Sequence, residues 1–331
     1  MKLLFVFTGG TIGSTQSGDV ISADNEKSYK IINAYAQKYG IDFDYDISEP
    51  YTELSENNTG LHIKMLVECI KKGLNKDYDG IIVTHGSDTL QYSASAIGYC
   101  CGIDSLPICV VAANYPIEDV RSNAMDNLHG AISFIKQRCG RGAFVVYRNA
   151  SGKSVCVHRA TRLVASKAYS DEVSSVRDLI YGFFDDAFNF IRNPDYREKK
   201  DECDLLDVVD LKNSSEKITV IGVYPAMAYP PISSKVKYVI LNTYHSGTLN
   251  TKAQSTVEFL SKAKKKGVTV YAAGVSDGAQ YSSSQAFETL GIIPIKNLSP
   301  ISAYVKLWLL SAMNKDASEL MQKSICGDII E

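Results

Sequence analysis

Residues 81–89 read IIVTHGSDT, and this stretch decides the fold. Four apolar or β-branched residues are followed at once by small and polar ones, and a helical pattern begins at Leu90. An uninterrupted apolar run of this length is typical of a strand buried on both faces, as in a parallel sheet. Residues 3–13 repeat the arrangement, because the run LLFVF at 3–7 leads directly into TGGTIG at 8–13.

Runs of the same kind recur along the chain, with helical patterns between many of them. We predict strands at 3–7, 81–84, 108–112, 143–147, 218–223, 238–241 and 268–272. We predict helices at 27–38, 62–74 and 251–266. Alternating strands and helices indicate right-handed crossovers in an open α/β sheet.

The length of the chain predicts two domains. At about 150 residues per domain, 331 residues give roughly two. Residues 189–217 break the alternating pattern with charged and polar side chains. We therefore predict a larger N-terminal α/β domain at 1–190 with a mainly parallel sheet, a connection at 191–216, and a smaller α/β domain at 217–331.

Composition excludes several classes of protein. Lys plus Arg is 35 and Asp plus Glu is 37, so the net charge of −2 does not suit a general nucleic-acid binder. No apolar run approaches the roughly 20 residues that span a membrane, and the run at 3–7 is too short for a secretory signal. The eight cysteines lack zinc-site spacing. We expect a cytoplasmic protein with reduced thiols and no metal site.

Ligands of open α/β sheets bind beyond the carboxyl ends of the strands, so the residues after each strand are the candidates for chemistry. Gly9 and Gly10 would let backbone N–H groups approach a ligand, and Thr11 adds a hydroxyl. Ser87 and Asp88 present a hydroxyl and a carboxylate just before a predicted helix. The alternative for this pair is simple capping of the helix N-terminus.

Two phosphate-binding patterns are excluded. The stretch 8–13 is not a dinucleotide fingerprint, because its first position is Thr8 and not glycine. Residues 152–154 read GKS, but a Walker A motif needs glycine at the place of Tyr147. We predict a hairpin turn at 150–153 instead.

TGGTIG at 8–13 together with HGSDT at 85–89 resembles the paired signature of the bacterial-type L-asparaginase/glutaminase family. Further similar segments follow in the family's order at 116–128, 224–227, 243–247, 281, 291–294 and 306–310. The resemblance implies an amidohydrolase that converts the side-chain amide of L-asparagine or L-glutamine to a carboxylate and ammonia. It also implies that no metal or organic cofactor takes part, and that the chain assembles as a homodimer or homotetramer.

The resemblance assigns catalytic roles to four residues. Thr11 would be the nucleophile, and Ser87 would take the place of the family's second active-site threonine, beside Asp88. Lys167 would be the family's lysine. A hydroxyl needs a neighbouring base, and a lysine can serve when burial lowers its pKa enough for a neutral fraction to exist.

The predicted substrate shell departs from the family. Gly10 and Gly86 would offer backbone groups, and Ser55 would join Asp88 in binding the α-amino and α-carboxyl groups of the substrate. Asp19 stands where the family's mobile loop has a tyrosine, and Glu56 adds a carboxylate beside Ser55. These changes favour either a weak asparaginase or a different substrate.

Two alternatives therefore stay open. The first is an amidohydrolase acting on another small-molecule amide, with a basic group facing Asp19 or Glu56. The second is a non-catalytic amino-acid-binding protein or an amidotransferase subunit on the same fold. Neither nucleic acid nor membrane is expected as a partner in any of these cases.

Overall fold

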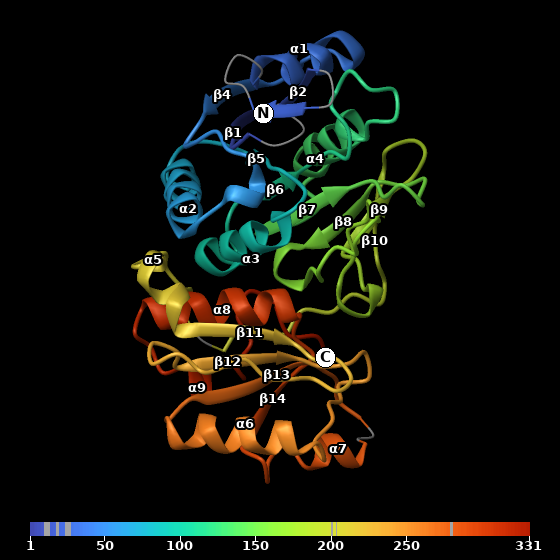
Figure 1. The fold of residues 1–331 in the computed structure, drawn as a ribbon. Helices are drawn as coiled ribbons and strands as arrows, with labels where there is room; N and C mark the ends of the chain where they lie inside the picture. Colours follow the sequence, from blue (N-terminus) through green and yellow to red (C-terminus); the bar gives the residue numbers. More distant parts are fainter. Residues whose placement is uncertain (10–13, 18–19, 24–27, 200, 203, 279–280) are drawn as a thin grey trace. The chain divides into compact units, whose positions relative to one another are not determined.

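A computed structural model describes residues 1–331 except 10–13, 18–19, 24–27, 200, 203 and 279–280, and it describes no side chains between 10 and 29 (Figure 1). The chain forms two compact units, Met1–Arg197 and Glu198–Glu331. Their boundary falls inside the predicted connection. Among the described residues, no helix has the length and apolar character needed to cross a membrane.

The N-terminal unit is built on a sheet of eight strands in the order β10-β9-β8-β7-β6-β5-β1-β4. Neighbours from β7 to β4 are parallel, whereas the pairs from β7 to β10 are antiparallel. The strands are β1 (Lys2–Phe7), β4 (Asp44–Ser48), β5 (Gly80–Thr84), β6 (Ile108–Val111), β7 (Ala143–Tyr147), β8 (Cys156–Arg159), β9 (Gly182–Phe184) and β10 (Phe190–Arg192). A separate antiparallel ribbon joins β2 (Ser14–Ser17) to β3 (Val20–Ala23). The predicted mainly parallel α/β fold is confirmed.

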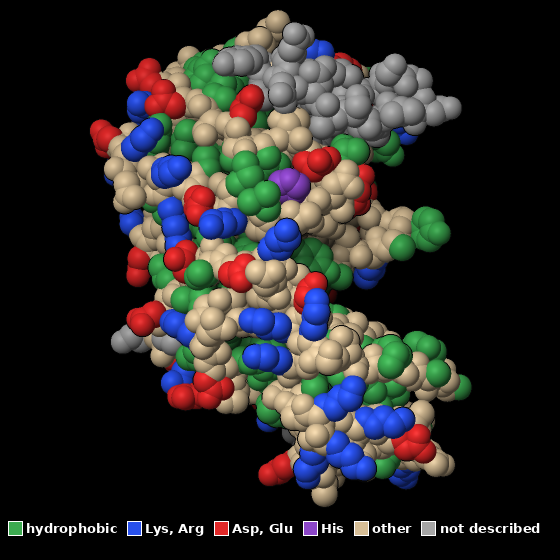
Figure 2. All heavy atoms as spheres, turned by 60° about the vertical axis from the view of Figure 1, so that its left-hand side comes forward, with side chains coloured by type: hydrophobic (Ala, Val, Ile, Leu, Met, Phe, Trp, Pro, Cys, Tyr) green, Lys and Arg blue, Asp and Glu red, His purple; other side chains and the backbone are tan. Residues whose placement is uncertain are grey.

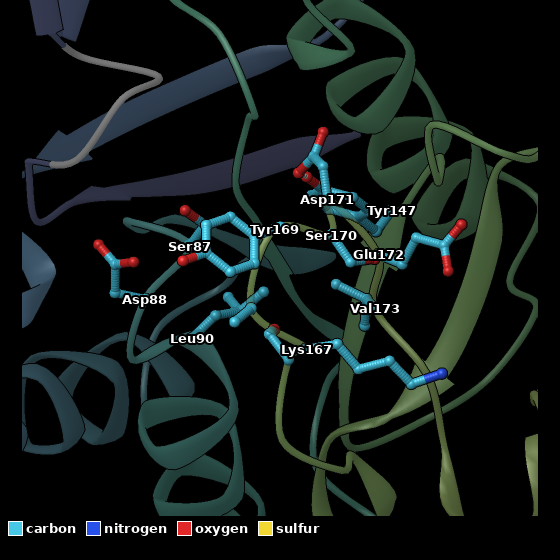
Figure 3. A pocket seen from close by; sticks show the side chains of 12 residues that line it. Ser87, Asp88, Leu90, Tyr147, Lys167, Tyr169, Ser170, Asp171, Glu172 and Val173 are labelled. Atoms are coloured by element: carbon cyan, nitrogen blue, oxygen red, sulfur yellow. Dashed lines mark hydrogen bonds between the residues drawn. The ribbon is translucent and has the colours of Figure 1, made fainter.

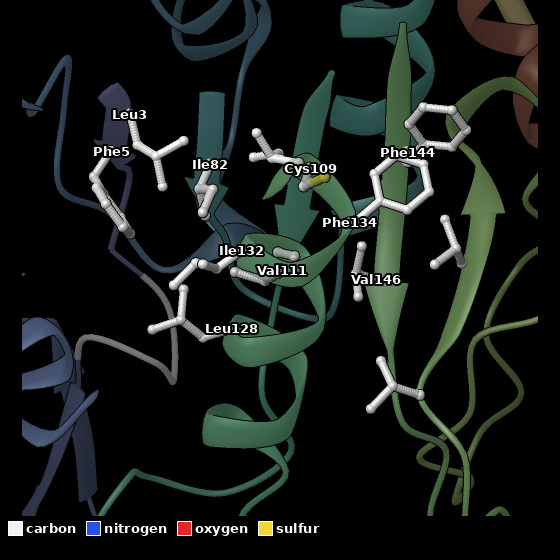
Figure 4. Packing of buried hydrophobic residues seen from close by; sticks show 14 of the residues in the cluster. Leu3, Phe5, Ile82, Cys109, Val111, Leu128, Ile132, Phe134, Phe144 and Val146 are labelled. Atoms are coloured by element: carbon white, nitrogen blue, oxygen red, sulfur yellow. The ribbon is translucent and has the colours of Figure 1, made fainter. Parts of the chain in front are cut away.

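Helices cover both faces of this sheet because successive side chains of its strands point in opposite directions. Phe5 and Ile82 pack under Leu128 and Ile132 of α4 (Ala124–Lys136), as Figure 4 shows. On the other face, α2 (Gly60–Leu74) approaches so closely that a Cβ on its Gly73 would lie 2.5 Å from Leu4. The remaining helices of the unit are α1 (Ser28–Tyr39), α3 (Leu90–Cys101), and the short η3 (Ser55–Asn57), η4 (Ala160–Arg162) and η5 (Val176–Asp178).

The C-terminal unit has a parallel sheet of four strands in the order β11-β12-β13-β14. The strands are β11 (Ile218–Gly222), β12 (Tyr238–Asn242), β13 (Thr269–Val275) and β14 (Ile292–Lys296). The helices are α5 (Leu211–Ser214), η6 (Ser215–Lys217), α6 (Gln254–Lys265), α7 (Ser282–Gln285), α8 (Pro300–Ala312) and α9 (Ala317–Leu320). Charges of both signs are interspersed over the face in Figure 2, in keeping with the small net charge.

All seven predicted strands and all three predicted helices are present, and the predicted turn at 150–153 joins β7 to β8. The structure adds strands that the apolar runs did not indicate. One of them, β4, is an edge strand whose first three residues are exposed, so its sequence DYDIS has no apolar run. The stretch 189–217 contains the strand β10, and it buries Leu206, Val208 and Leu211.

A buried ion pair joins α8 to the C-terminal segment. Lys306 Nζ lies 2.9 Å from Asp328 Oδ2, and neither side chain has any exposed surface. We expect Lys306→Met to lower the free energy of unfolding by about 3–5 kcal/mol, because it leaves a buried carboxylate without its counter-charge. Urea unfolding followed by circular dichroism measures this loss. The matched control is Lys235→Met, whose exposed partner Glu216 lies 2.7 Å away, and a loss there as large as that of Lys306→Met would contradict the prediction.

Burial of His158 in β8 makes the stability of the N-terminal unit depend on pH. Its Nδ1 lies 2.8 Å from Ser175 Oγ, and burial lowers the pKa of His158 to about 4. In the unfolded chain the pKa is about 6.5, so below that pH the unfolded state binds the proton more readily. The free energy of unfolding should therefore fall as the pH drops, by about 2 kcal/mol between about pH 6.5 and pH 5.

Urea unfolding at several pH values tests this dependence. His158→Gln should make the profile flatter, since Gln does not titrate, whereas His245→Gln replaces an exposed histidine and should leave the profile unchanged. An unchanged slope in His158→Gln would show that other groups cause the dependence. One contributor is His85, whose pKa is also lowered by burial.

Candidate functional site

A cavity of about 400 Å³ opens beyond the carboxyl end of β5 in the N-terminal unit (Figure 3). Ser87, Asp88 and Leu90 line one side of it. The segment 166–173, which joins η4 to η5, lines the other side, together with Tyr147 at the end of β7. The cavity is thus where the sheet topology predicted a ligand site.

Ser87 and Asp88 lie between β5 and α3 and do not cap the helix. The N-cap residue of α3 is Thr89, and its hydroxyl donates to the carbonyl oxygen of Ser55 at 2.8 Å and makes no capping bond. Ser87 is half-buried and Asp88 is exposed, and both border the cavity. The alternative that Ser87 and Asp88 simply cap the helix is therefore wrong for this structure. Their hydroxyl and carboxylate border the cavity instead.

The loop that carries Ser87 packs against Ser55 through Gly86. A Cβ on Gly86 would lie 2.5 Å from Ser55 Oγ, so only glycine allows this approach. Ser55 is 3% exposed, and its hydroxyl has no hydrogen-bond partner within the described part of the chain. An unpaired buried hydroxyl costs about 1–3 kcal/mol, which favours a bound polar group beside it.

His85 is a structural residue of this loop. Its side chain is fully buried, and burial lowers its pKa, so the ring is neutral. His85 Nδ1 lies 2.7 Å from the carbonyl oxygen of Gly86, which can only accept, so Nδ1 carries the proton. Nε2 then accepts from the amide of Asn58 at 3.3 Å, which ties the loop to the segment after η3.

The residues that follow β1 contact both the end of β5 and the segment before η3. Thr8 is buried and donates from Oγ1 to the carbonyl oxygen of Thr84 at 2.8 Å. Gly9 has a φ of 91°, and a Cβ there would lie 2.5 Å from the carbonyl oxygen of Glu53. The first two residues of one motif, Thr8 and Gly9, therefore lie next to the other motif at the carboxyl ends of β1 and β5, which pair directly.

Three predicted site residues, Gly10, Thr11 and Asp19, lie outside the described part of the chain. Glu56 lies in η3, where it is exposed, and it does not border the cavity as the described residues define it.

Lys167 differs from the expectation of a buried amine beside Asp88. It borders the cavity, but it is exposed and its side chain runs away from Ser87 and Asp88 (Figure 3). It belongs to a turn in which the N–H of Ser170 donates to its carbonyl oxygen at 3.2 Å. Residues 165–169 are all exposed, so this amine does not have the buried surroundings that the expectation requires.

The cavity also contains residues that sequence reasoning missed. Tyr147 is buried and donates from its hydroxyl to Asp171 Oδ1 at 2.6 Å, and both burial and this carboxylate raise its pKa. Tyr147 could have been found, because it ends a predicted strand whose carboxyl end faces the cavity. Asp171 and Tyr169 could not, since they lie in a polar loop without any pattern.

Comparison with known proteins gives relatives over most of the chain. The chain is 26% identical over 294 residues to a glutamyl-tRNA(Gln) amidotransferase subunit from Methanococcus maripaludis strain C5, covering 84% of this chain and 68% of that protein. The match to the amidotransferase subunit of the same name from Methanobrevibacter smithii is 25% over 350 residues and covers 100% of this chain and 77% of that protein.

Solved structures share the whole fold. The thermostable L-asparaginase from Thermococcus kodakarensis superposes with a TM-score of 0.79 at 18% identity over 100% of both chains. L-asparaginase I from Vibrio cholerae gives 0.76 at 20% identity over 100% of this chain and 99% of that one. The family model described as "Asparaginase, N-terminal" matches residues 2–183, more than half of the chain. The chain therefore belongs to the asparaginase family of amidohydrolases.

Proposed function

We propose that this amidohydrolase converts the side-chain amide of L-asparagine, or of L-glutamine, to a carboxylate and ammonia. The observation that carries the proposal is the pair Ser87 and Asp88, which borders the cavity without serving as the cap of α3. A hydroxyl beside a carboxylate can accept and return protons during attack on an amide carbon. The buried Ser55 hydroxyl beside Gly86 does not line the cavity, but it has no hydrogen-bond partner among the described residues, which supports a polar group near this loop.

The proposed reaction has two steps. The hydroxyl of Thr11 attacks the amide carbon, its proton passes to the amide nitrogen, and ammonia leaves as an ester forms on Thr11. Water then attacks the ester carbon, which releases the carboxylate product and restores the hydroxyl of Thr11. Ser87 and Asp88 would hold the moving protons in both steps. Backbone N–H groups near them would stabilise the oxyanion, at about 2.7–4 kcal/mol per donor.

The substrate contacts are proposed from the family resemblance. Asp88 would bind the α-amino group, and Ser55 the α-carboxyl group, with Gly10 and Gly86 offering backbone groups. Asp19 and Glu56 would add negative charge to the substrate shell. The same proposal includes the cytoplasmic location expected from the sequence and the homodimer or homotetramer that the resemblance implies.

A second candidate is an amidotransferase subunit, which the names of the relatives from Methanococcus and Methanobrevibacter favour. A protein of this kind would deliver ammonia to a partner protein. The purified chain would then release little ammonia alone, and more with its partner. Hydrolysis by the chain alone therefore separates the two candidates.

The first experiment measures ammonia release from L-asparagine, D-asparagine, L-glutamine and N-substituted or basic amides. We expect turnover of L-asparagine or L-glutamine, and we expect Thr11→Ala, Ser87→Ala and Asp88→Asn each to lower kcat by about 100-fold or more. Asp104→Asn is the control, since Asp104 is exposed and does not border the cavity as described. Wild-type activity in a folded Thr11→Ala variant would overturn the assignment of the nucleophile.

For Lys167, the role that the family resemblance implies disagrees with the direction of its side chain in the structure. Because its amine is exposed and directed away from Asp88, we expect Lys167→Met to lower kcat/KM less than about threefold. Steady-state kinetics beside Asp88→Asn measures this. A loss as large as that of Asp88→Asn would show instead that Lys167 acts as the base that the resemblance implies.

A further inference from the structure

The loop between η4 and η5 has a rigid stem. Asn149 and Val173 form a reciprocal pair, in which the side-chain amide of Asn149 donates to the carbonyl oxygen of Val173 and its Oδ1 accepts from the N–H of Val173, both at 2.9 Å. Leu163 and Ser175 form an isolated antiparallel bridge, and His158 holds the hydroxyl of Ser175 from below. The stem is thus tied to β8 and to the turn after β7.

The tip of this loop presents an aromatic side chain to the cavity. Tyr169 lies in the turn that begins at Lys167, with a left-handed φ of 60°. Its relative exposure is 110%, so the ring is uncovered although it borders the cavity. In Figure 3 the ring extends from the loop toward Ser87 and Asp88. A large ring held in this way across from the proposed reacting groups is placed to cover a bound substrate.

Carboxylates near Tyr169 determine which kind of ligand group the ring can contact. Asp171 is two residues further along the same loop, and Tyr147 holds its Oδ1 at 2.6 Å. Its other oxygen, Oδ2, is buried and has no hydrogen-bond partner among the described residues. Asp88 faces the cavity from the opposite side, while the amine of Lys167 points away. An aromatic face next to carboxylates attracts an ammonium group.

We propose that Tyr169 is a specificity-determining residue, whose ring covers the ammonium group of the amide substrate, with Asp171 as a second counter-charge beside Asp88. This inference rests on the proposed amide hydrolysis and names the part of the substrate that the loop recognises. It predicts a preference for amides that carry an ammonium group over otherwise equal amides that lack one. The ring, rather than the phenol hydroxyl, makes the contact.

Kinetics on two substrates test the role of Tyr169. L-asparagine and succinamate have the same amide and carboxylate, but succinamate lacks the ammonium group. We expect Tyr169→Ala to lower kcat/KM for L-asparagine about tenfold and for succinamate less than about twofold, because a cation–π contact is lost only with the former. Tyr169→Phe should stay within about twofold of wild type on both. Asp171→Asn, which still accepts from Tyr147, should show the same selective loss as Tyr169→Ala.

The control is Tyr224→Ala, which removes an exposed tyrosine of the other unit and should change neither substrate. Equal losses on both substrates in Tyr169→Ala, or no loss on L-asparagine, would overturn the inference. If wild type releases no ammonia from L-asparagine, L-glutamine or succinamate, the proposed function fails, and calorimetry then decides the inference separately. Weaker binding of L-asparagine to Tyr169→Ala than to wild type supports it, and equal binding overturns it.

Discussion

The contact between Gly86 and Ser55 is the constraint on which the site depends. The space at Gly86 has no room for a side chain, since a Cβ would lie 2.5 Å from Ser55 Oγ. This contact presses the loop after β5 against η3, and the hydroxyl of Thr89 fastens the two through the carbonyl oxygen of Ser55. The buried, neutral ring of His85 also holds the loop, through its hydrogen bond to the carbonyl oxygen of Gly86. The positions of Ser87 and Asp88 therefore depend on these contacts of the loop and not on capping of α3.

The other side of the cavity is held by different means. Its loop lies between the antiparallel strands β8 and β9 in the chain, and its stem depends on side-chain to backbone pairs such as that of Asn149 with Val173. Tyr147 connects the two sides, because it ends the parallel strand β7 and donates to Asp171 of the loop. In the proposed function, the carboxyl ends of the parallel strands thus carry the reacting groups, and the loop carries the groups that meet the rest of the substrate. Rigid support on both sides favours a preorganised site.

Sequence patterns could predict the half of the site that lies on parallel strands. Apolar runs marked β1 and β5, and the rule that ligands bind at the carboxyl ends of strands selected Ser87 and Asp88. The loop half could not be predicted, because its position depends on antiparallel strands β8 to β10, which are short and only partly apolar. Lys167 shows the consequence. Its place in the sequence suggested a base, but the turn that contains it points its amine into solvent.

This division also bears on the difference between hydrolysis and transfer. The relatives named as amidotransferase subunits and the asparaginases of known structure share one fold with this chain, and a fold does not fix a function. The loop after β5 carries the motif from which the family was inferred, so it does not distinguish the two activities. Under the inference made for Tyr169, the groups that cover the cavity select the substrate. In this chain those groups include the exposed Tyr169 and the half-buried Asp171, on a loop whose stem is fixed and whose tip is free of packing.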